Sequence, residues 1–325
     1  MMQDKTSTLT STSTSTCCRA QPLPQPQASP LVTVGIPFYN AEETLADAIR
    51  SVFVQTLTDW ELILMDDGST DAGLEIARSI TDPRVRVVSD GRNLRLAARL
   101  NQIAQLARGD YLARMDADDL MHQHRLAAQA EFLDQNPAID VVGTGMYILD
   151  TEGHPVAKRP ASTAPLTARR VFAGDCLAHA TVMGRTTWFR RNTYDPTFRR
   201  TQDFELWCRT LGHSRFARMP VCNYYCTEYA AFSLSKYAGS TWSVVRTHWK
   251  HGLSQVGFLS CCILSAGQLL KLLVYAVAGA LRVQGRLIAR RSTTLVPSEI
   301  EQVAADIAYI RSMTLPTRQP VTSEG

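Results

Sequence analysis

Short apolar runs alternate with amphipathic stretches along the first 120 residues of the chain. The apolar runs have the composition of buried strands, and they lie at residues 31–36, 61–65, 85–88 and 111–115. Between them, apolar residues recur at three- and four-residue steps, which predicts helices over residues 41–54, 70–80 and 96–107. Strands that alternate with helices across short polar loops indicate a mostly parallel sheet with helices on both faces.

The pattern is less regular after residue 120. One more helix is predicted over residues 122–133, and two more strands are predicted at residues 139–142 and 146–149. Residues 161–200 are rich in arginine and show no clear period, so we expect irregular structure there. Helical spacing returns near residues 202–211 and again over residues 297–313.

Residues 256–281 are almost wholly apolar, with Gln268 and Lys271 as interruptions. Their length permits one membrane span, but a lysine near the centre of a bilayer costs roughly 2.5–3.5 kcal/mol. Basic residues on both sides instead favour a helix that lies in the headgroup region of an anionic membrane. These flanking residues are Arg246, Lys250, Arg282, Arg286, Arg290 and Arg291. A buried helical hairpin and a true span stay open as alternatives.

The composition adds limits on the class of protein. Hydrophobic residues make up 45% of the chain and charged residues 20%, which are ordinary globular values. The net charge is +4, so nothing in the charge predicts a nucleic-acid partner. The eight cysteines include the adjacent pairs Cys17-Cys18 and Cys261-Cys262, and their spacing matches neither a disulfide framework nor a zinc site. A reducing, cytoplasmic location is therefore expected.

The N-terminal segment consists of Ser/Thr repeats followed by Gln and Pro, with too little apolar surface to fold. It lacks the continuous apolar core of a secretory signal, so we do not expect export. The predicted organisation is a disordered tail (1–30), an α/β domain (31–235), a helical, apolar and basic region (236–315) and a disordered end (316–325).

Polar side chains follow three of the predicted strands. Tyr39 and Asn40 follow the first strand, and Asp67 follows the second. The fourth strand is followed by three aspartates, which are Asp116, Asp118 and Asp119. Because ligands of open α/β sheets bind outside the carboxyl ends of the strands, these side chains predict a nucleotide site.

The three aspartates stand within four residues of one another. Carboxylates this close repel each other and lose hydration if they are partly enclosed. A hard divalent cation that keeps open positions for phosphate oxygens would stabilise them. An acidic surface turn is the alternative, since Asp is common in turns. Suitable chemistry at three separate strand ends favours the nucleotide site.

Four motifs occur in order, at residues 34–40 (Val-Gly-Ile-Pro-Phe-Tyr-Asn), 66–71 (Asp-Asp-Gly-Ser-Thr-Asp), 114–119 (Arg-Met-Asp-Ala-Asp-Asp) and 202–207 (Gln-Asp-Phe-Glu-Leu-Trp). Together they resemble the family 2 glycosyltransferases, which are inverting enzymes with the GT-A fold. The resemblance covers roughly residues 31–230. It implies an α/β fold with a Rossmann-like mixed sheet, helices on both faces, and here a C-terminal helical extension. The nucleotide-binding half would be about 31–120 and the acceptor half about 121–235.

The resemblance also implies roles for residues on the donor side. Pro37, Tyr39 and Asn40 match the segment that cradles the nucleobase, and Asp67 would accept a hydrogen bond from the base. Asp116 and Asp118 match the DxD motif, which contacts the ribose and the diphosphate. We expect Asp118 and Asp119 to bind Mn2+ or Mg2+.

On the acceptor side, Asp203 matches the position of the catalytic base of the family. From this residue alone, a first-turn helix aspartate stabilised by the helix dipole is the favoured interpretation, and the motif around it reverses that preference. His179 lies where relatives line the acceptor or the diphosphate, and its alternative is a hydrogen-bonded core histidine. Arg95 stands where relatives commonly have glycine, which could alter the loop or direct a cation toward the diphosphate.

The resemblance predicts a metal-dependent transferase that moves one sugar from a UDP-, dTDP- or GDP-sugar to a glycan or polyprenyl-linked acceptor. Such an enzyme would act in cell-surface polysaccharide or glycoconjugate synthesis, at the cytoplasmic face of an anionic membrane. The processive Gln-x-x-Arg-Trp motif is missing after Asp203, so single additions are expected. Two alternatives stay open: a sugar nucleotidyltransferase and a non-catalytic nucleotide- or glycan-binding protein at a membrane. The Pro37–Asn40 segment, in place of a Gly-rich loop, disfavours the first.

Overall fold

The computed structural model describes residues 29–228, 233–281 and 292–318. All but the last two residues of the predicted disordered tail lie outside these ranges. The same is true of the flanking residues Arg282, Arg286, Arg290 and Arg291.

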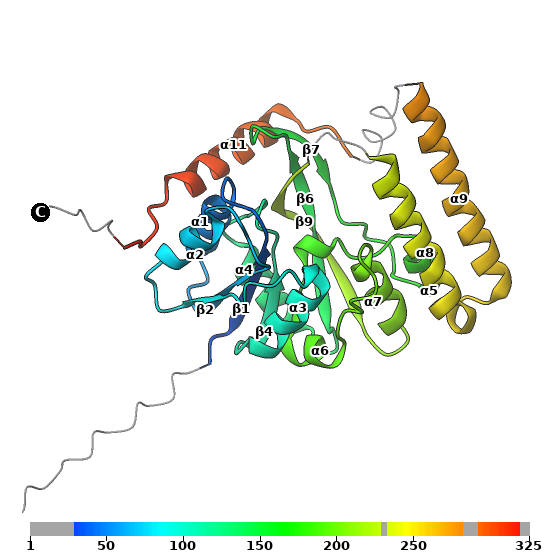
Figure 1. The fold of residues 1–325 in the computed structure, drawn as a ribbon, viewed down its shortest axis with the longest axis horizontal. Coiled ribbons are helices and arrows are strands. Elements are labelled where there is room, and N and C mark those ends of the chain that lie inside the picture. The colour runs from blue at the N-terminus through cyan, green and yellow to red at the C-terminus, as the bar shows by residue number, and fades with distance from the viewer. Residues whose placement is uncertain (1–28, 229–232, 282–291, 319–325) are drawn as a thin grey trace, which may run out of the picture.

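The first four strands form the parallel half of one sheet (Figure 1). They are β1 (Val32–Phe38), β2 (Trp60–Asp66), β3 (Val85–Val88) and β4 (Tyr111–Arg114). Their order is β3-β2-β1-β4, and each neighbouring pair is parallel. Every residue of β1 and β2 is buried, as expected for strands covered on both faces. The strands predicted from the apolar runs are confirmed.

The other strands make the sheet mixed. They are β5 (Leu120–Met121), β6 (Val141–Leu149), β7 (Pro155–Arg159), β8 (Met183–Arg185) and β9 (Phe216–Thr227). Strand β8 pairs antiparallel with both β4 and β6, and β9 runs parallel to β6. Strands β5, β7 and β9 were not predicted: β5 and β9 depend on partners far away in the chain, whereas β7 pairs with β6 across a short turn.

The two strands predicted at 139–142 and 146–149 are wrong as separate elements, since they form the single strand β6. The Gly143-Thr144-Gly145 segment looked like a break. In the structure, a Cβ on Gly145 would lie 2.8 Å from the Cys222 sulfur of β9. The glycine therefore allows β6 and β9 to lie close together, and it does not end the strand.

Helices cover both faces of the sheet (Figure 1). One face is packed by α1 (Leu45–Phe53), α2 (Gly73–Ser79) and α4 (Arg125–Gln135). The other face is packed by α3 (Arg95–Leu106), α5 (Ala168–Phe172), α6 (Thr186–Arg191) and α7 (Gln202–Thr210). The irregular structure expected over residues 161–200 is wrong, because α5, α6, β8 and the short helix η1 (His179–Thr181) lie there. These elements are too short for a periodic pattern, and Trp188 anchors them by stacking on Trp207 with ring centroids 6.0 Å apart.

A helical hairpin follows the sheet. It consists of α8 (Leu234–Gln255) and α9 (Phe258–Ala280), which pack along each other. Helix α8 contacts α5 and α7, and buried His248 bonds through Nε2 to the Phe172 carbonyl at 3.0 Å. Helix α9 lies outermost (Figure 1) and is long and apolar enough to cross a membrane, with a mean hydropathy of 1.8 over Phe258–Gly279. The apolar segment is thus one arm of a hairpin packed through α8.

Helix α11 (Pro297–Ser312) returns to the first half of the domain and lies against α1 and β7. Its buried residues Val303, Ile307 and Ile310 pack with Leu120 and Leu149. The Tyr225 hydroxyl donates to Asp306 of this helix at 2.7 Å. After the helix, residues 316–318 hydrogen-bond with residues 79–81, so the disorder expected from residue 316 is wrong for these three.

The packing of α11 gives a stability prediction. Ile307 is 3% exposed, so Ile307→Ala should lower the free energy of unfolding by about 2–5 kcal/mol through lost burial and a cavity. Tyr309→Ala on the same helix is the matched control, because Tyr309 is 53% exposed and should change stability by less than about 0.5 kcal/mol. Urea unfolding followed by circular dichroism measures both. Equal losses in the two variants would contradict the packing of α11 as part of the domain.

Candidate active site

The loops after β1 and β2 are tied together at the carboxyl edge of the sheet. The backbone N–H of Asn40 donates to the Ser69 hydroxyl at 3.1 Å, and the Asn40 side-chain oxygen accepts from the Thr70 N–H at 2.8 Å. Asn40 has a φ of 49°, in the left-handed region that asparagine tolerates better than most residues. The segment at 37–40 is therefore held in one shape by its neighbour.

A cavity of about 450 Å³ lies between these loops and the loop after β4. It brings together five of the predicted site residues: Pro37, Tyr39, Asn40, Asp116 and Asp118. The Tyr39 side chain is exposed, with a ring available to a planar ligand. A smaller hollow of about 290 Å³ adjoins it and shares Asp118; helix α11 places Arg311 on its lining.

Asp67 is buried and bound by donors from the start of α3. Its carboxylate accepts from the backbone N–H of Leu94 at 2.7 Å, from that of Arg95 at 3.0 Å and from Arg99 Nε at 2.9 Å. Arg95 has a φ of 71°, so the arginine keeps the left-handed turn for which glycine is the usual residue. The loop shape is retained, and the contact of Asp67 with a base stays a prediction.

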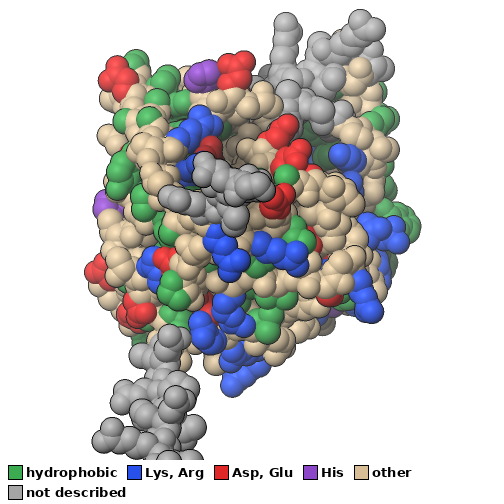
Figure 2. All heavy atoms as spheres, turned by 60° about the vertical axis from the view of Figure 1, so that its left-hand side comes forward, with side chains coloured by type: hydrophobic (Ala, Val, Ile, Leu, Met, Phe, Trp, Pro, Cys, Tyr) green, Lys and Arg blue, Asp and Glu red, His purple; other side chains and the backbone are tan. Residues whose placement is uncertain are grey.

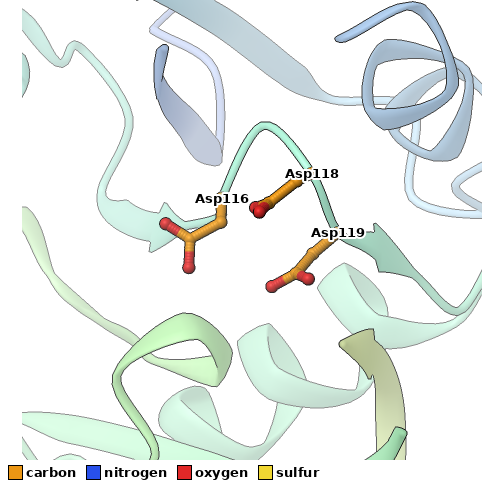
Figure 3. A group of neighbouring side chains, drawn as sticks. All are labelled: Asp116, Asp118 and Asp119. Atoms are coloured by element: carbon orange, nitrogen blue, oxygen red, sulfur yellow. The ribbon is translucent and has the colours of Figure 1, made fainter. Parts of the chain in front are cut away.

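Asp116, Asp118 and Asp119 lie together on the turn between β4 and β5 (Figure 3). One carboxylate oxygen from each lies within 4.8 Å of those of the other two. Asp119 is buried, and it accepts from the Tyr224 hydroxyl and the Thr227 N–H, both at 2.9 Å. Burial and the two neighbouring carboxylates raise the pKa of Asp119 to about 7, and partial burial together with Asp116 also raises the pKa of Asp118. Three close oxygen donors with unfavourable charge fit a hard divalent cation such as Mn2+ or Mg2+.

Two buried arginines lie beneath the acidic turn, and the sequence did not single them out. Arg114 at the end of β4 pairs with Asp116. Arg125 at the start of α4 lies over the Tyr224 ring, 5.0 Å from its centroid, and donates to the Arg114 carbonyl at 2.8 Å. A charged residue that ends an apolar strand was the available signal for Arg114. Tyr224 had no local signal, because β9 itself was not predicted.

Asp203 lies in the first turn of α7, partly buried on the side of Arg114 and Asp116. Burial raises the pKa of Asp203, while the positive charge of Arg114 opposes this shift. His179 bonds through Nε2 to the Tyr194 hydroxyl at 2.9 Å, and burial lowers its pKa well below the usual value. The ring of His179 is therefore neutral. Asp203 lies within electrostatic reach of Asp116, and His179 has the hydrogen-bonded environment of the core alternative.

Glu205, two residues after Asp203, fixes α7 to the hairpin. It is fully buried, and its carboxylate lies 2.7 Å from His251 Nε2 of α8 and 2.9 Å from Arg209 Nε. These partners lower the pKa of Glu205 although burial alone would raise it. Helix α8 is thus tied directly to the helix that carries Asp203.

The surface charge is mixed outside the site. Figure 2 shows acidic and basic side chains interspersed over one face of the molecule, which agrees with a net charge of +4. A single-signed field of the kind that steers nucleic acids is not a feature of this face.

The chain matches proteins of known sequence. The family model described as Glycosyl transferase family 2 matches residues 33–198. The putative glycosyltransferase EpsE of Bacillus subtilis (strain 168) is 38% identical over 189 residues, which cover 56% of this chain and 67% of that protein. The putative teichuronic acid biosynthesis glycosyltransferase TuaG of the same strain is 29% identical over 226 residues, which cover 67% of this chain and 88% of that protein.

Solved structures share the fold. TarS 1–349 of S. aureus, in complex with UDP, aligns with a TM-score of 0.55 at 19% identity, over 86% of this chain and 81% of that one. The mannosyltransferase PcManGT of Pyrobaculum calidifontis, in complex with GDP-Man and Mn2+, aligns with a TM-score of 0.54 at 16% identity, over 89% of this chain and 87% of that one. The predicted GT-A fold is confirmed.

The buried carboxyl of Asp119 gives a pH prediction. Between its ordinary pKa of 3.8 and about 7, the folded protein holds a proton that the unfolded chain has released. The stability of the metal-free protein should therefore fall as pH rises across this window, by up to about 1.4 kcal/mol per pH unit from this group. Urea unfolding in EDTA at several pH values measures the slope. Asp119→Asn should reduce the slope, and parallel curves for the two proteins would contradict the assignment.

Proposed function

The chain belongs to glycosyl transferase family 2, and on that premise we propose that it is an inverting, metal-dependent enzyme that transfers one sugar from a nucleotide donor to a glycan or lipid-linked acceptor. The observation that carries the proposal is the position of Asp203 beside the acidic turn. Asp203 is partly buried at the start of α7, and it lies close enough to Arg114 and Asp116 for their charges to act on it, which supports a base next to the donor site.

The donor is proposed to be a UDP-, dTDP- or GDP-sugar that lies in the cavity after β1. Pro37, Tyr39 and Asn40 would lie against the base, with Asp67 fixing the loop beneath it. Asp116 would contact the ribose, and Asp118 with Asp119 would hold Mn2+ or Mg2+. TarS with UDP and PcManGT with GDP-Man and Mn2+ have the same fold, which supports this class of donor.

The proposed reaction is a displacement at C1 of the donor sugar. The acceptor oxygen forms the new bond to C1 as the bond from C1 to the diphosphate oxygen breaks, and the electron pair of that bond leaves with the nucleoside diphosphate. The acceptor proton passes to the Asp203 carboxylate, which must therefore be ionised at the start. The developing positive charge at C1 also favours a nearby carboxylate. A bound divalent cation would supply charge neutralisation at the diphosphate.

Burial tunes Asp203 for this role. It raises the pKa of Asp203 above the ordinary value of 3.8, and a stronger base accepts the acceptor proton more readily. The charge of Arg114 opposes this rise and favours the ionised carboxylate. A base needs both effects.

The acceptor is proposed to be presented at an anionic membrane, as a polyprenyl-linked or similar lipid-linked glycan in cell-surface polysaccharide synthesis. The outer face of α9 supports this, since Leu259, Leu270 and Leu273 are 72%, 61% and 59% exposed. Exposed Trp242 and Trp249 of α8 extend the apolar surface. The names of EpsE and TuaG agree with a transferase, and that of TuaG with an envelope polymer. A cytoplasmic, peripheral location follows as part of the proposal.

Catalysis can be tested by substitution. Asp203→Asn should lower kcat by about 10²–10⁴-fold through loss of the base, with little change in the melting temperature or in the donor KM. Asp118→Asn and EDTA should each abolish transfer, and Mn2+ should restore the EDTA-treated wild type. Donors are first chosen by metal-dependent thermal stabilisation with UDP-, dTDP- and GDP-sugars, and transfer is then followed by mass spectrometry.

Asp195→Asn is the control for these variants, because Asp195 lies in the preceding loop and bonds to Thr197 and Lys250. It should retain kcat. Unchanged transfer in both Asp118→Asn and Asp203→Asn would overturn the proposed function.

Membrane binding has a separate test. Replacing Leu259, Leu270 and Leu273 together by Ser should abolish co-sedimentation with anionic vesicles, because the variant lacks the exposed apolar side chains that would contact lipid. A matched control replaces Ile300 and Tyr309 by Ser, because both are exposed on α11, away from the hairpin. Equal sedimentation of the leucine variant and wild type would contradict membrane binding through α9. Analytical ultracentrifugation tests the other possibility. If the wild type is a dimer and the leucine substitutions dissociate it, the apolar face of α9 binds a second copy of the chain and not a membrane.

A further inference from the structure

Arg114 is a buried cation with an unused donor. It ends β4, between β1 and β8 in the middle of the sheet, and is 5% exposed. Its guanidinium pairs with Asp116. Its Nε is buried and has no hydrogen-bond partner among the residues that the structure describes. Because buried N–H groups of native proteins are almost always paired, this donor beside Asp116 is open to a partner from outside the chain.

The charges around Arg114 place it between the two sides of the site. It pairs with Asp116 of the donor side, and it is the positive charge that acts on Asp203 and Tyr194 of the acceptor side. The neutral His179 lies on the same side of Arg114 and bonds to Tyr194. Arg114 therefore pairs with a residue that lines the donor cavity, and its charge also acts on Asp203.

We propose that Arg114 binds the donor directly: its guanidinium orients Asp116, and its unpaired Nε–H donates to a donor oxygen between Asp116 and Asp203. This inference rests on the proposed transfer reaction. As the bond from C1 to the diphosphate oxygen breaks, negative charge grows on the leaving group, and a fixed guanidinium stabilises that charge more than it stabilises the ground state. A lysine would keep the charge but lose the planar fork that serves two oxygens at once.

Arg114 should also affect how the rate of transfer depends on pH, because its charge acts on Asp203. Five groups interact electrostatically with Asp203. They are Arg114 on β4, Asp116 on the following turn, Tyr194 before α7, Cys176 after α5 and Cys208 on α7. Arg114 is the cation of this set. Without its charge, burial and Asp116 would hold a proton on Asp203 to higher pH, so the acidic limb of the rate profile would move upward.

The experiment compares Arg114→Lys and Arg114→Met in the full-length enzyme, with steady-state kinetics in donor and a pH profile of kcat/KM. Arg114→Met should lower kcat/KM by about 10²–10³-fold and move the acidic limb to higher pH. Arg114→Lys should keep the acidic limb of the wild type and recover only part of the rate. Millimolar guanidinium should restore part of the activity of Arg114→Ala. Arg114→Lys keeps the buried charge, and its partial loss of rate carries the test if the Met variant does not fold.

Arg185→Met is the matched control. Arg185 is the partner of Tyr111 at the other end of the β4–β8 pair, and its guanidinium bonds to the carbonyls of Ile139 and Leu133. This variant should lose thermal stability without a change in the pH profile. If Arg114→Met behaves in the same way while Asp203→Asn abolishes transfer, the role of Arg114 is overturned and the proposed function stands. If Asp203→Asn also transfers normally, the proposed function itself fails.

Discussion

The pairing of buried Arg114 with the aspartate cluster is the interaction on which the rest of the structure depends. Three carboxylates on one turn repel each other, and burial of Asp119 removes water that would screen them. Arg114 supplies the direct counter-charge, and Arg125 supports it from below by donating to its carbonyl. Both arginines are buried, so each guanidinium loses its hydration when the protein folds, and this loss opposes folding. A site that concentrates charge in this way needs a rigid frame.

That frame comes from parts of the chain that lie far from the acidic turn in sequence. Strand β9 brings Tyr224 and Thr227 to Asp119, so the last strand of the sheet holds the carboxylate in place. Helix α11 then binds the next residue of that strand, since Tyr225 donates to Asp306. The hairpin stands between β9 and α11 in sequence, but α11 packs against α1 and β7. The catalytic domain is therefore completed by the C-terminal helix, and the hairpin is inserted within it.

The sequence predicted the parts whose signals are local. The parallel half of the sheet and its helices follow from apolar periods, and the acidic turn follows from three aspartates after a strand. Strand β9 depends on pairing with residues far away in the chain and was not predicted, while helix α8, whose apolar period is weak, was predicted only as part of a helical region. The same limit applies to the site: Arg114 was quoted within a motif, but its role depends on which groups the fold places around it. Arg95 shows the opposite case, because the loop keeps a left-handed turn against the preference of the residue.

Asp119 and Asp203 show how one charge distribution gives two carboxylates different chemistry. Burial raises the pKa of both, so burial cannot distinguish them. The difference lies in the neighbours: Asp119 faces two more carboxylates, whereas Asp203 faces the Arg114 guanidinium. Asp119 therefore gains from an added cation, while Arg114 favours the ionised form of Asp203. Because Arg114 pairs with Asp116 and acts on Asp203, a single buried arginine separates a group suited to holding metal from a group suited to accepting a proton.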